Sequence, residues 1–349
     1  MNTFVCVWQY MSRWLRVAGQ CVLLAIMTVS TVAQARAQAP ATGTSPTLWF
    51  SAITEIPAPA GFQVDQDYPQ LFEPGAPWQH ALSRVQVFQM TRRDVMSRPD
   101  EKLQIAFAFL RQHRIALAVT FGMIPDNNCG EGVEGMVHNS NANLVTAQRI
   151  KKLGGDLQYI NVDEPLFFGH YFTGQNRKRG CRYPMEELVA GYASEIRKVR
   201  SVFPDARVVE DEPVEGLESA SDLGRWIDLL KHELGEGAPR AIRLDVQWAS
   251  SKRPWRTAAQ SLVTAIKRKG LGYGVIFDGT PEDRTNEDWI RTAQANIRAW
   301  EATIQAIPDD VMIQSWHRHP EKLLPETSPT LPYLVNWYCE NARMARRDR

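Results

Sequence analysis

The sequence predicts a single (β/α)8 TIM barrel of the α/β class, and three observations lead to this fold. Eight short apolar runs, rich in β-branched and aromatic residues, recur along the chain. Stretches with helical periodicity separate most of these runs, as parallel βαβ units require. The first run is followed by Thr54-Glu55-Ile56-Pro57 and not by the glycine-rich turn that is common in doubly wound sheets. Eight strands alternating with helices over about 300 residues match the barrel in count and size.

Each expected element follows from its local pattern. The expected strands are 48–53, 84–90, 116–123, 157–164, 206–212, 241–248, 272–279 and 311–316. The expected helices cover 99–112, 184–203, 222–234, 257–269, 287–307 and 332–344. Between the first two strands, repeated prolines leave room for little more than a turn at 78–82.

The N-terminal segment has the pattern of a secretory signal. Arg13 and Arg16 precede an apolar core at 22–32, and Ala33-Gln34-Ala35 and Ala37-Gln38-Ala39 are candidate cleavage sites. The apolar core is short for a membrane span, which needs about 20 residues. We therefore expect residues 1–39 to be a cleaved signal peptide, and the mature protein to be secreted or periplasmic. Residues 40–47 would form a linker, 48–345 the barrel and 346–349 a basic tail.

The charge balance argues against several partners. The 349 residues include 40 basic and 39 acidic side chains, which gives a net charge of +1. This lacks the basic excess of a nucleic-acid binder or of a protein that binds anionic membranes. We expect a monomer with neither kind of partner.

Three cysteines remain after the expected signal peptide. Cys129 and Cys181 both lie in loops that follow predicted strands, so the barrel would bring these loops to one end. We therefore predict a disulfide between them, and the alternative is that all three thiols, including Cys339, are free or buried. The sequence has no Cys-x-x-Cys pair, so a structural zinc site is not indicated.

Acidic and tryptophan residues gather where the predicted strands end. In barrels of this kind, the chemistry takes place at the carboxyl ends of the strands. The relevant segments are Asp163-Glu164-Pro165, Glu210-Asp211-Glu212-Pro213, Asp245-Val246-Gln247-Trp248, Asp278-Gly279 and Trp316-His317. Alternation places Asn161 and Asp163 on the same face of their strand, whereas Glu164 falls at the turn, where alternation does not fix its direction.

Strand four carries a resemblance to a known family. Its ending, Asp163-Glu164-Pro165, resembles the Asn-Glu-Pro ending of the (β/α)8 glycoside hydrolase superfamily. The resemblance implies that Glu164 is the general acid/base and that Asp163 takes the place of the preceding Asn. Those enzymes usually supply a nucleophilic Glu at the end of strand seven, and this sequence has Asp278-Gly279 there.

Glycoside hydrolysis needs one carboxylic acid to protonate the leaving oxygen and a second carboxylate to attack or to activate water. The predicted catalytic residues are Glu164, Glu212 and Asp278, with Asp245 and Glu326 as further candidates for the second carboxylate. The predicted substrate-binding residues are Asp163, His170, Tyr171, Asp245, Trp248, Trp316 and His317. Each of these has a structural alternative, because strand-end carboxylates cap helices or form ion pairs and tryptophans seal barrel ends.

Two other functions stay open. One is a metal-dependent barrel enzyme, in which oxygen ligands and His170 bind Mg²⁺ or Mn²⁺, although His317-Arg318-His319 is the only tight ligand-like spacing. The other is a carbohydrate-binding barrel without catalysis. The sequence has no Gly-x-Ser-x-Gly, phosphate-binding loop or His-Glu-x-x-His motif, so we expect a hydrolase without metal or cofactor.

Overall fold

A computed structural model describes residues 45–52, 67–126, 129, 133–137, 139–175, 178–249 and 255–345 of the chain. The expected signal peptide at 1–39 and the basic tail at 346–349 lie outside these ranges. The first strand begins at Thr47.

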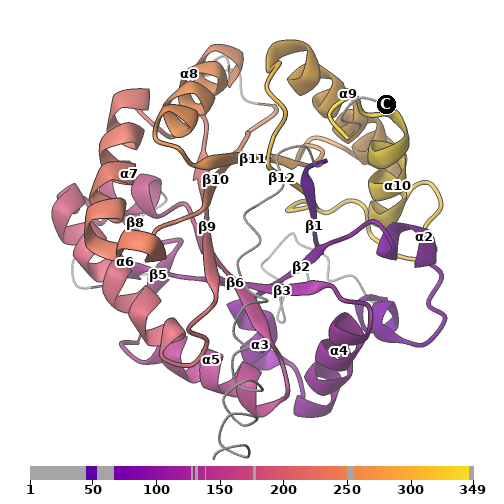
Figure 1. The fold of residues 1–349 in the computed structure, drawn as a ribbon. Coiled ribbons are helices and arrows are strands. Elements are labelled where there is room, and N and C mark those ends of the chain that lie inside the picture. Colours follow the sequence, from indigo (N-terminus) through magenta and orange to yellow (C-terminus); the bar gives the residue numbers. More distant parts are fainter. Residues whose placement is uncertain are drawn as a thin grey trace, which may run out of the picture. The chain divides into compact units, whose positions relative to one another are not determined.

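The prediction of a (β/α)8 barrel is confirmed by a closed barrel of eight parallel strands in the order β1-β12-β11-β10-β9-β6-β3-β2 (Figure 1). These strands are β1 (Thr47–Ser51), β2 (Val87–Thr91), β3 (Ala116–Phe121), β6 (Leu157–Asp163), β9 (Arg207–Pro213), β10 (Ala241–Asp245), β11 (Gly272–Phe277) and β12 (Asp310–Gln314). Because all eight run in the same direction, their carboxyl ends meet at one end of the barrel, which we call the mouth.

Helices surround the barrel in Figure 1. They are α2 (Gln79–Leu82), α3 (Arg92–Ser97), α4 (Asp100–Gln112), α5 (Ala142–Lys152), α6 (Met185–Arg200), α7 (Ala220–Leu234), α8 (Trp255–Arg268), α9 (Asn286–Thr303) and α10 (Leu331–Asn341). Several begin at a capping side chain, as at Ser219 and Thr285, whose hydroxyls accept the N–H of Asp222 and Asp288. No helix in the described ranges is long and apolar enough to cross a membrane.

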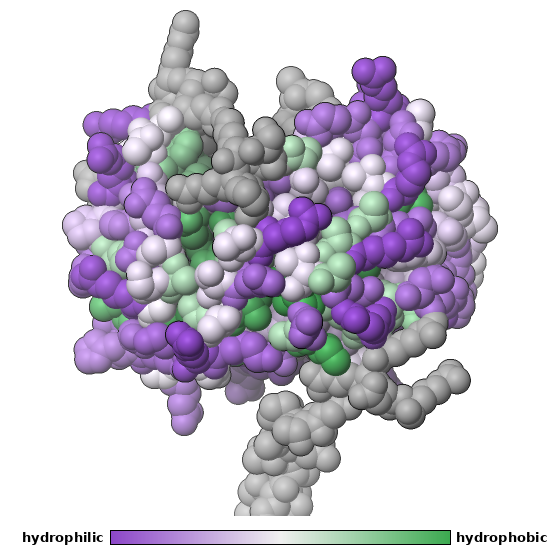
Figure 2. All heavy atoms as spheres, turned by 90° about the horizontal axis from the view of Figure 1, so that it is seen from above, coloured by the Kyte–Doolittle hydropathy of each residue, from purple (hydrophilic) through white to green (hydrophobic). Residues whose placement is uncertain are grey.

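The strands are buried on both faces, which explains why their sequences are apolar almost throughout. The barrel interior contains one apolar cluster, made of Trp49, Val87, Ala118, Tyr159, Val209, Ile276 and Met312. A larger cluster fills the space between strands and helices. The side of the barrel shown in Figure 2 is covered mostly by hydrophilic residues, with hydrophobic ones in the recesses between them.

The short helix α3 was not expected from the sequence, and neither was the longer helix α5. Its buried face contains Asn143 and Thr146 beside Ala147 and Ile150, so its apolar periodicity is weak. Between β1 and β2, the described part holds only the 3-10 helix Tyr68–Phe72 and α2, in agreement with the proline-rich sequence.

Short elements lie in the loops of the mouth. They are β4 (Ile124–Pro125), β5 (Met136–Val137), a π-helix (Phe167–Tyr171), β7 (Gly174–Gln175) and β8 (Lys178–Arg179); a further 3-10 turn, Gly235–Gly237, follows α7. A disulfide joins Cys129 to Cys181, 52 positions apart, and so links the loop after β3 to the segment before α6. Cys339 is free and half-buried.

Candidate active site

A cavity of about 500 Å³ opens at the mouth, beside the ends of β6, β9, β10, β11 and β12. Its volume falls in the range typical of small-molecule sites. Its lining includes Glu164, Pro213, Asp245, Trp248, Asp278, Thr280, Glu282, Trp316 and His317. The structure thus gathers six of the residues that the sequence analysis singled out, namely Glu164, Asp245, Asp278, Trp248, Trp316 and His317.

Glu164 is the residue that directly follows β6. It has a φ of 45°, in the left-handed region that is unfavourable for residues with a side chain. Its backbone N–H donates to the carbonyl of Asp211 on β9 at 2.9 Å, and its own carbonyl accepts the N–H of Phe168 at 3.0 Å. These two bonds hold the residue in this conformation at the cavity. Burial raises the pKa of Glu164, and repulsion from Asp245 and Asp163 raises it further.

Asp163 and Asp245 are the last residues of β6 and β10. Burial raises the pKa of Asp163 well above its ordinary value, and the charges of Glu134 and Asp211 add to this effect. Burial and the neighbouring Asp211 raise the pKa of Asp245 to about 7, with Arg243 acting in the opposite direction. Asp163 is not part of the cavity lining, whereas Asp245 is.

Asp278 and His317 form the opposite side of the cavity. Asp278 follows β11, and the Nε2 atom of His317 lies 3.7 Å from its Oδ2 atom. Burial raises the pKa of Asp278, and the charge of Asp245 contributes to the same shift. Burial lowers the pKa of His317, so a neutral imidazole is favoured there. This pair offers a hydrogen-bonding wall opposite Glu164.

The two cavity tryptophans differ in their surroundings. Trp248 packs within an aromatic cluster, stacked on Phe277 at a centroid distance of 5.8 Å and edge-on to Trp255 and Trp300. Trp316 is half-buried and has no ring contact among the described residues. Trp248 therefore has a packing role, and Trp316 is the aromatic side chain that a ligand can stack on.

Glu212 does not line the cavity. It is fully buried, with 0% exposure, on the face of β9 that points away from the barrel interior. Its carboxylate accepts the backbone N–H of Leu166 at 2.7 Å and of Phe167 at 3.2 Å. The prediction that Glu212 faces Glu164 as a second catalytic carboxylate is thus not supported by its position.

Three further candidates also bind local partners outside the cavity lining. Glu326 accepts the N–H groups of His80 and Ala81 at the start of α2. The Nδ1 atom of His170 is 2.5 Å from the carbonyl of Tyr183. The Tyr171 hydroxyl donates to Asp222 on α7 at 2.7 Å.

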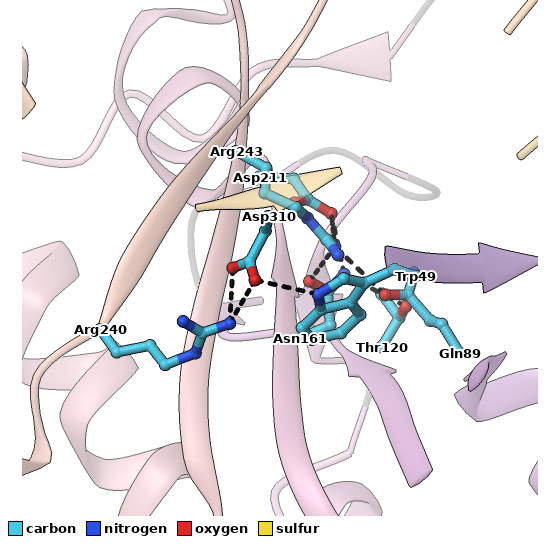
Figure 3. Close-up of polar contacts among 8 residues, drawn as sticks. All are labelled: Trp49, Gln89, Thr120, Asn161, Asp211, Arg240, Arg243 and Asp310. Atoms are coloured by element: carbon cyan, nitrogen blue, oxygen red, sulfur yellow. Dashed lines mark hydrogen bonds and ion pairs between the residues drawn. The ribbon is translucent and has the colours of Figure 1, made fainter. Parts of the chain in front are cut away.

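The sequence analysis missed a buried polar network directly below the mouth (Figure 3). Its centre is Arg243 on β10, whose guanidinium donates to Asp211 at 2.6 and 2.8 Å and to Asn161 at 2.6 Å. The same group donates to Gln89 at 3.1 Å and lies 4.4 Å from the ring of Trp49. Alternation along β10 could have revealed it, because Arg243 shares its strand face with Asp245.

Within the described ranges, no group of three or more His, Cys, Asp or Glu side chains has an arrangement that could hold a metal ion. His319 of the sequence His317-Arg318-His319 is buried, and its Nδ1 atom lies 2.8 Å from the side-chain oxygen of Asn286.

Comparisons with known proteins find similar solved structures but no matching family. No protein-family model matches the chain, and no curated protein matches it. Among solved structures, the chain is similar to a GH10 structure from Paenibacillus barcinonensis, with 14% identity over 84% of this chain and 95% of that one, at a TM-score of 0.48. A glucosidase from Croceicoccus marinus is 12% identical over 84% of this chain and 68% of that one, at a TM-score of 0.49.

A variant of the carboxyl transferase domain of Rhizobium etli pyruvate carboxylase matches at 13% identity, with a TM-score of 0.50, over 87% of this chain and 45% of that one. At such low identity, the likeness shows the barrel fold, and any function has to be argued from the site.

Proposed function

We propose that this protein is a glycoside hydrolase-like enzyme, which hydrolyses O-glycosidic bonds of an oligo- or polysaccharide with Glu164 and a second carboxylate, Asp245. The observation that carries the proposal is the shared cavity at the barrel mouth, which Glu164, Asp245 and Trp316 line together. Glycosidic cleavage requires two carboxyl groups around one space, and an aromatic side chain beside them supports the binding of a sugar ring.

Glu164 is suited to be the general acid. Its raised pKa, caused first by burial and then by neighbouring carboxylates, favours the protonated form that a general acid needs. In the reaction its carboxyl proton passes to the glycosidic oxygen while the bond from that oxygen to the anomeric carbon breaks. Glu164 is then left as a carboxylate.

Asp245 is suited to be the second carboxylate. Burial and the charge of Asp211 raise its pKa to about 7, and Arg243 acts in the opposite direction, so an ionised Asp245 is available near neutral pH. An ionised Asp245 either takes a proton from the water that attacks the anomeric carbon or attacks that carbon itself. The anomer of the first product, measured by proton NMR, distinguishes these two routes.

Other cavity residues bind substrate in this proposal. Trp316 stacks on an apolar sugar face, and Asp278 with His317 binds hydroxyl groups on the other side. Asp278 is the alternative for the second carboxylate, so its variant belongs in the same experiment.

The test uses purified protein from residue 40 onward with a panel of polysaccharides and aryl glycosides. Glu164→Gln and Asp245→Asn should each lower kcat by roughly a hundredfold or more with folding intact. An aryl glycoside with a good leaving group should restore turnover by Glu164→Gln in part, since that bond breaks without an acid, but should not restore Asp245→Asn. Glu282→Gln, a change to another cavity glutamate, is the matched control and should keep most activity.

Turnover that survives Glu164→Gln and Asp245→Asn on natural glycans contradicts this assignment. Loss of turnover in Asp278→Asn but not in Asp245→Asn moves the second role to Asp278. Saturable glycan binding without turnover by the wild type favours a binding barrel, and inhibition by a chelator favours the metal-dependent enzyme.

We also propose that the protein is exported. The basic and apolar pattern of residues 11–39 supports this. N-terminal sequencing of the protein recovered outside the cytoplasm should show cleavage after Ala35 or Ala39, and recovery of the uncleaved chain from the cytoplasm alone would contradict it.

A further inference from the structure

A buried ion pair lies directly beneath the acidic residues of the mouth. Asp211 on β9 and Arg243 on β10 are 3% and 0% exposed, and two hydrogen bonds of 2.6 and 2.8 Å join them. Asn161 donates to Asp211 at 2.9 Å and accepts from Arg243 at 2.6 Å, which closes a three-membered network. In this buried setting, the charge of each side chain stabilises the ionised form of the other.

Room for Arg243 depends on β11. Gly274 lies beside Arg243 in the strand register. A Cβ atom at Gly274 would come within 2.5 Å of the Cγ atom of Arg243 and 2.9 Å of the Asp310 carbonyl. The glycine thus lets the long side chain lie across the barrel interior.

The pair also contacts or adjoins three acids of the mouth, Asp163, Glu164 and Asp245. Asp211 is the register partner of Asp163 between β6 and β9. Asp245 follows Arg243 by two residues and points to the same side of β10. The backbone carbonyl of Asp211 accepts the N–H of Glu164, the residue with the unfavourable φ.

We propose that the Asp211–Arg243 pair is a positioning element of the active site, which sets the electrostatic field at Asp163 and Asp245. The inference rests on the proposed function only for its effect on turnover. The electrostatic effect on Asp163 and Asp245 is a property of the folded barrel and can be measured without a substrate.

The charged groups around Asp245 determine whether its pKa is raised or lowered. Asp245 faces Asp211 and Glu215 from β9 and the turn after it, Glu134 from the segment before β5, and Arg243 from its own strand. Asp163 and Glu164 at the end of β6, and Asp278 just after β11, also interact with Asp245, and Glu282 and His317 line the same cavity. The effect of Asp211 on the pKa of Asp245 is upward and larger than the downward effect of Arg243.

The decisive variant is Asp211→Asn. It removes the anion and leaves the cation of Arg243 without its partner, and both changes lower the pKa of Asp245. We expect the titration of Asp245, followed by carboxyl ¹³C NMR and assigned with Asp245→Asn, to move down by about one pH unit or more. The acidic limb of the kcat/KM profile should move in the same direction. A purely structural role would reduce turnover at every pH without moving the profile.

A second buried carboxylate–arginine pair, Asp310 with Arg240, provides a comparison at the start of β12, next to Gly274. Asp310 at the start of β12 is also fully buried, accepts two hydrogen bonds from Arg240 of 2.5 and 2.6 Å, and accepts one from Trp49 (Figure 3). Asp310→Asn makes the same chemical change at a carboxylate whose register partners are Thr47 and Gly274, and not Asp163 or Asp245. It should lower the unfolding temperature without moving the titration of Asp163 or Asp245.

A second variant covers the case in which Asp211→Asn does not fold. Asp211→Asn combined with Arg243→Gln removes both charges and leaves no unpaired ion. The pKa of Asp245 should still fall, by less than in the single variant, because Asp211 has the larger effect.

A folded Asp211 variant with unchanged titration of Asp163 and Asp245 overturns the inference. So does an equal shift in Asp310→Asn. The NMR titration needs no substrate. If the wild type hydrolyses no glycan, the proposed function is wrong, and the titration still tests this inference.

Discussion

The carboxylate of Glu212, on the outer face of β9, accepts the backbone N–H of Leu166 at 2.7 Å. Leu166 is only two residues after Glu164, so Glu212 anchors the turn that carries the proposed acid. Burial and the neighbouring Glu210 raise the pKa of Glu212, while the N–H groups of Leu166 and Phe167 act to lower it. Glu212 thus acts on the site through backbone position.

Glu212→Ala should therefore reduce stability. The change leaves the N–H groups of Leu166 and Phe167 without this acceptor, and we expect the free energy of unfolding to fall by about 1–3 kcal/mol for the buried Leu166 group and by less for the half-buried Phe167 group. Turnover should fall with it, because the turn after Glu164 loses its anchor. Chemical denaturation measures the first effect, and Glu164→Gln, which should not lower stability, is the comparison. A Glu212→Ala protein as stable as the wild type would contradict this role.

Glu164→Gly should separate stability from activity. Glycine adopts a φ of 45° without strain, so we expect the free energy of unfolding to rise by about 1 kcal/mol, while turnover falls by at least about a hundredfold. Arg114→Gly is the matched control, since Arg114 has a φ of 57° in the turn between α4 and β3. It should stabilise the protein to a similar extent and leave turnover unchanged. Thermal unfolding and initial rates test both, and a destabilised Glu164→Gly protein would show that the backbone is not strained.

Glu210 should make stability depend on pH. Its carboxyl group is fully buried on the outer face of β9 and accepts the indole N–H of Trp226 at 2.6 Å. Burial raises its pKa from 4.5 to about 8. Between these values the folded state keeps a proton that the unfolded state has lost, so stability falls as the pH rises from 4.5 to 8, on the order of a few kcal/mol.

Glu210→Gln retains an acceptor for Trp226 and cannot ionise. Its free energy of unfolding should match the wild type near pH 4.5 and exceed it at pH 8, as measured by denaturation at both values. A parallel pH dependence in both proteins would mean that Glu210 is ionised throughout.

The two cavity tryptophans should respond differently to truncation. Trp316→Ala should weaken glycan binding roughly 2- to 10-fold, as the loss of one aromatic stacking contact implies, and leave stability nearly unchanged. Trp248→Ala removes a ring from the cluster with Phe277, Trp255 and Trp300, and should lower the free energy of unfolding by about 3 kcal/mol. Titration calorimetry and denaturation check the pair, and equal losses of stability would contradict the distinction.

The fold could be predicted because its signals are local. Each barrel strand is a short apolar run, and the apolar periodicity of α8, with Leu262 and Ile266 on its buried face, is plain in the sequence. The helix α5 was missed because its buried face carries Asn143 and Thr146. Asn143 binds the Gly122 carbonyl and Glu195, a contact between distant segments that no local pattern reveals.

The site could be predicted only in part, because strands buried on both faces do not reveal which face is inside. Glu164, Asp245 and Asp278 were found because they stand at strand ends, where the barrel places chemistry. Glu212 has the same sequence signal, yet it points to the helix layer while Asp211 points inward. That distinction depends on the inward direction of β9, which only the assembled barrel fixes.

The disulfide between Cys129 and Cys181 makes the stability of the loops at the mouth depend on the redox conditions. It closes a loop over 52 positions that contains β6 and Glu164, and a crosslink of this span stabilises a fold by about 4 kcal/mol in the chain-entropy description. A reducing environment removes that constraint from the segment on which the proposed acid depends. Protein for any measurement of the cavity should therefore be folded under oxidising conditions, with the Cys129–Cys181 link verified by peptide mapping first.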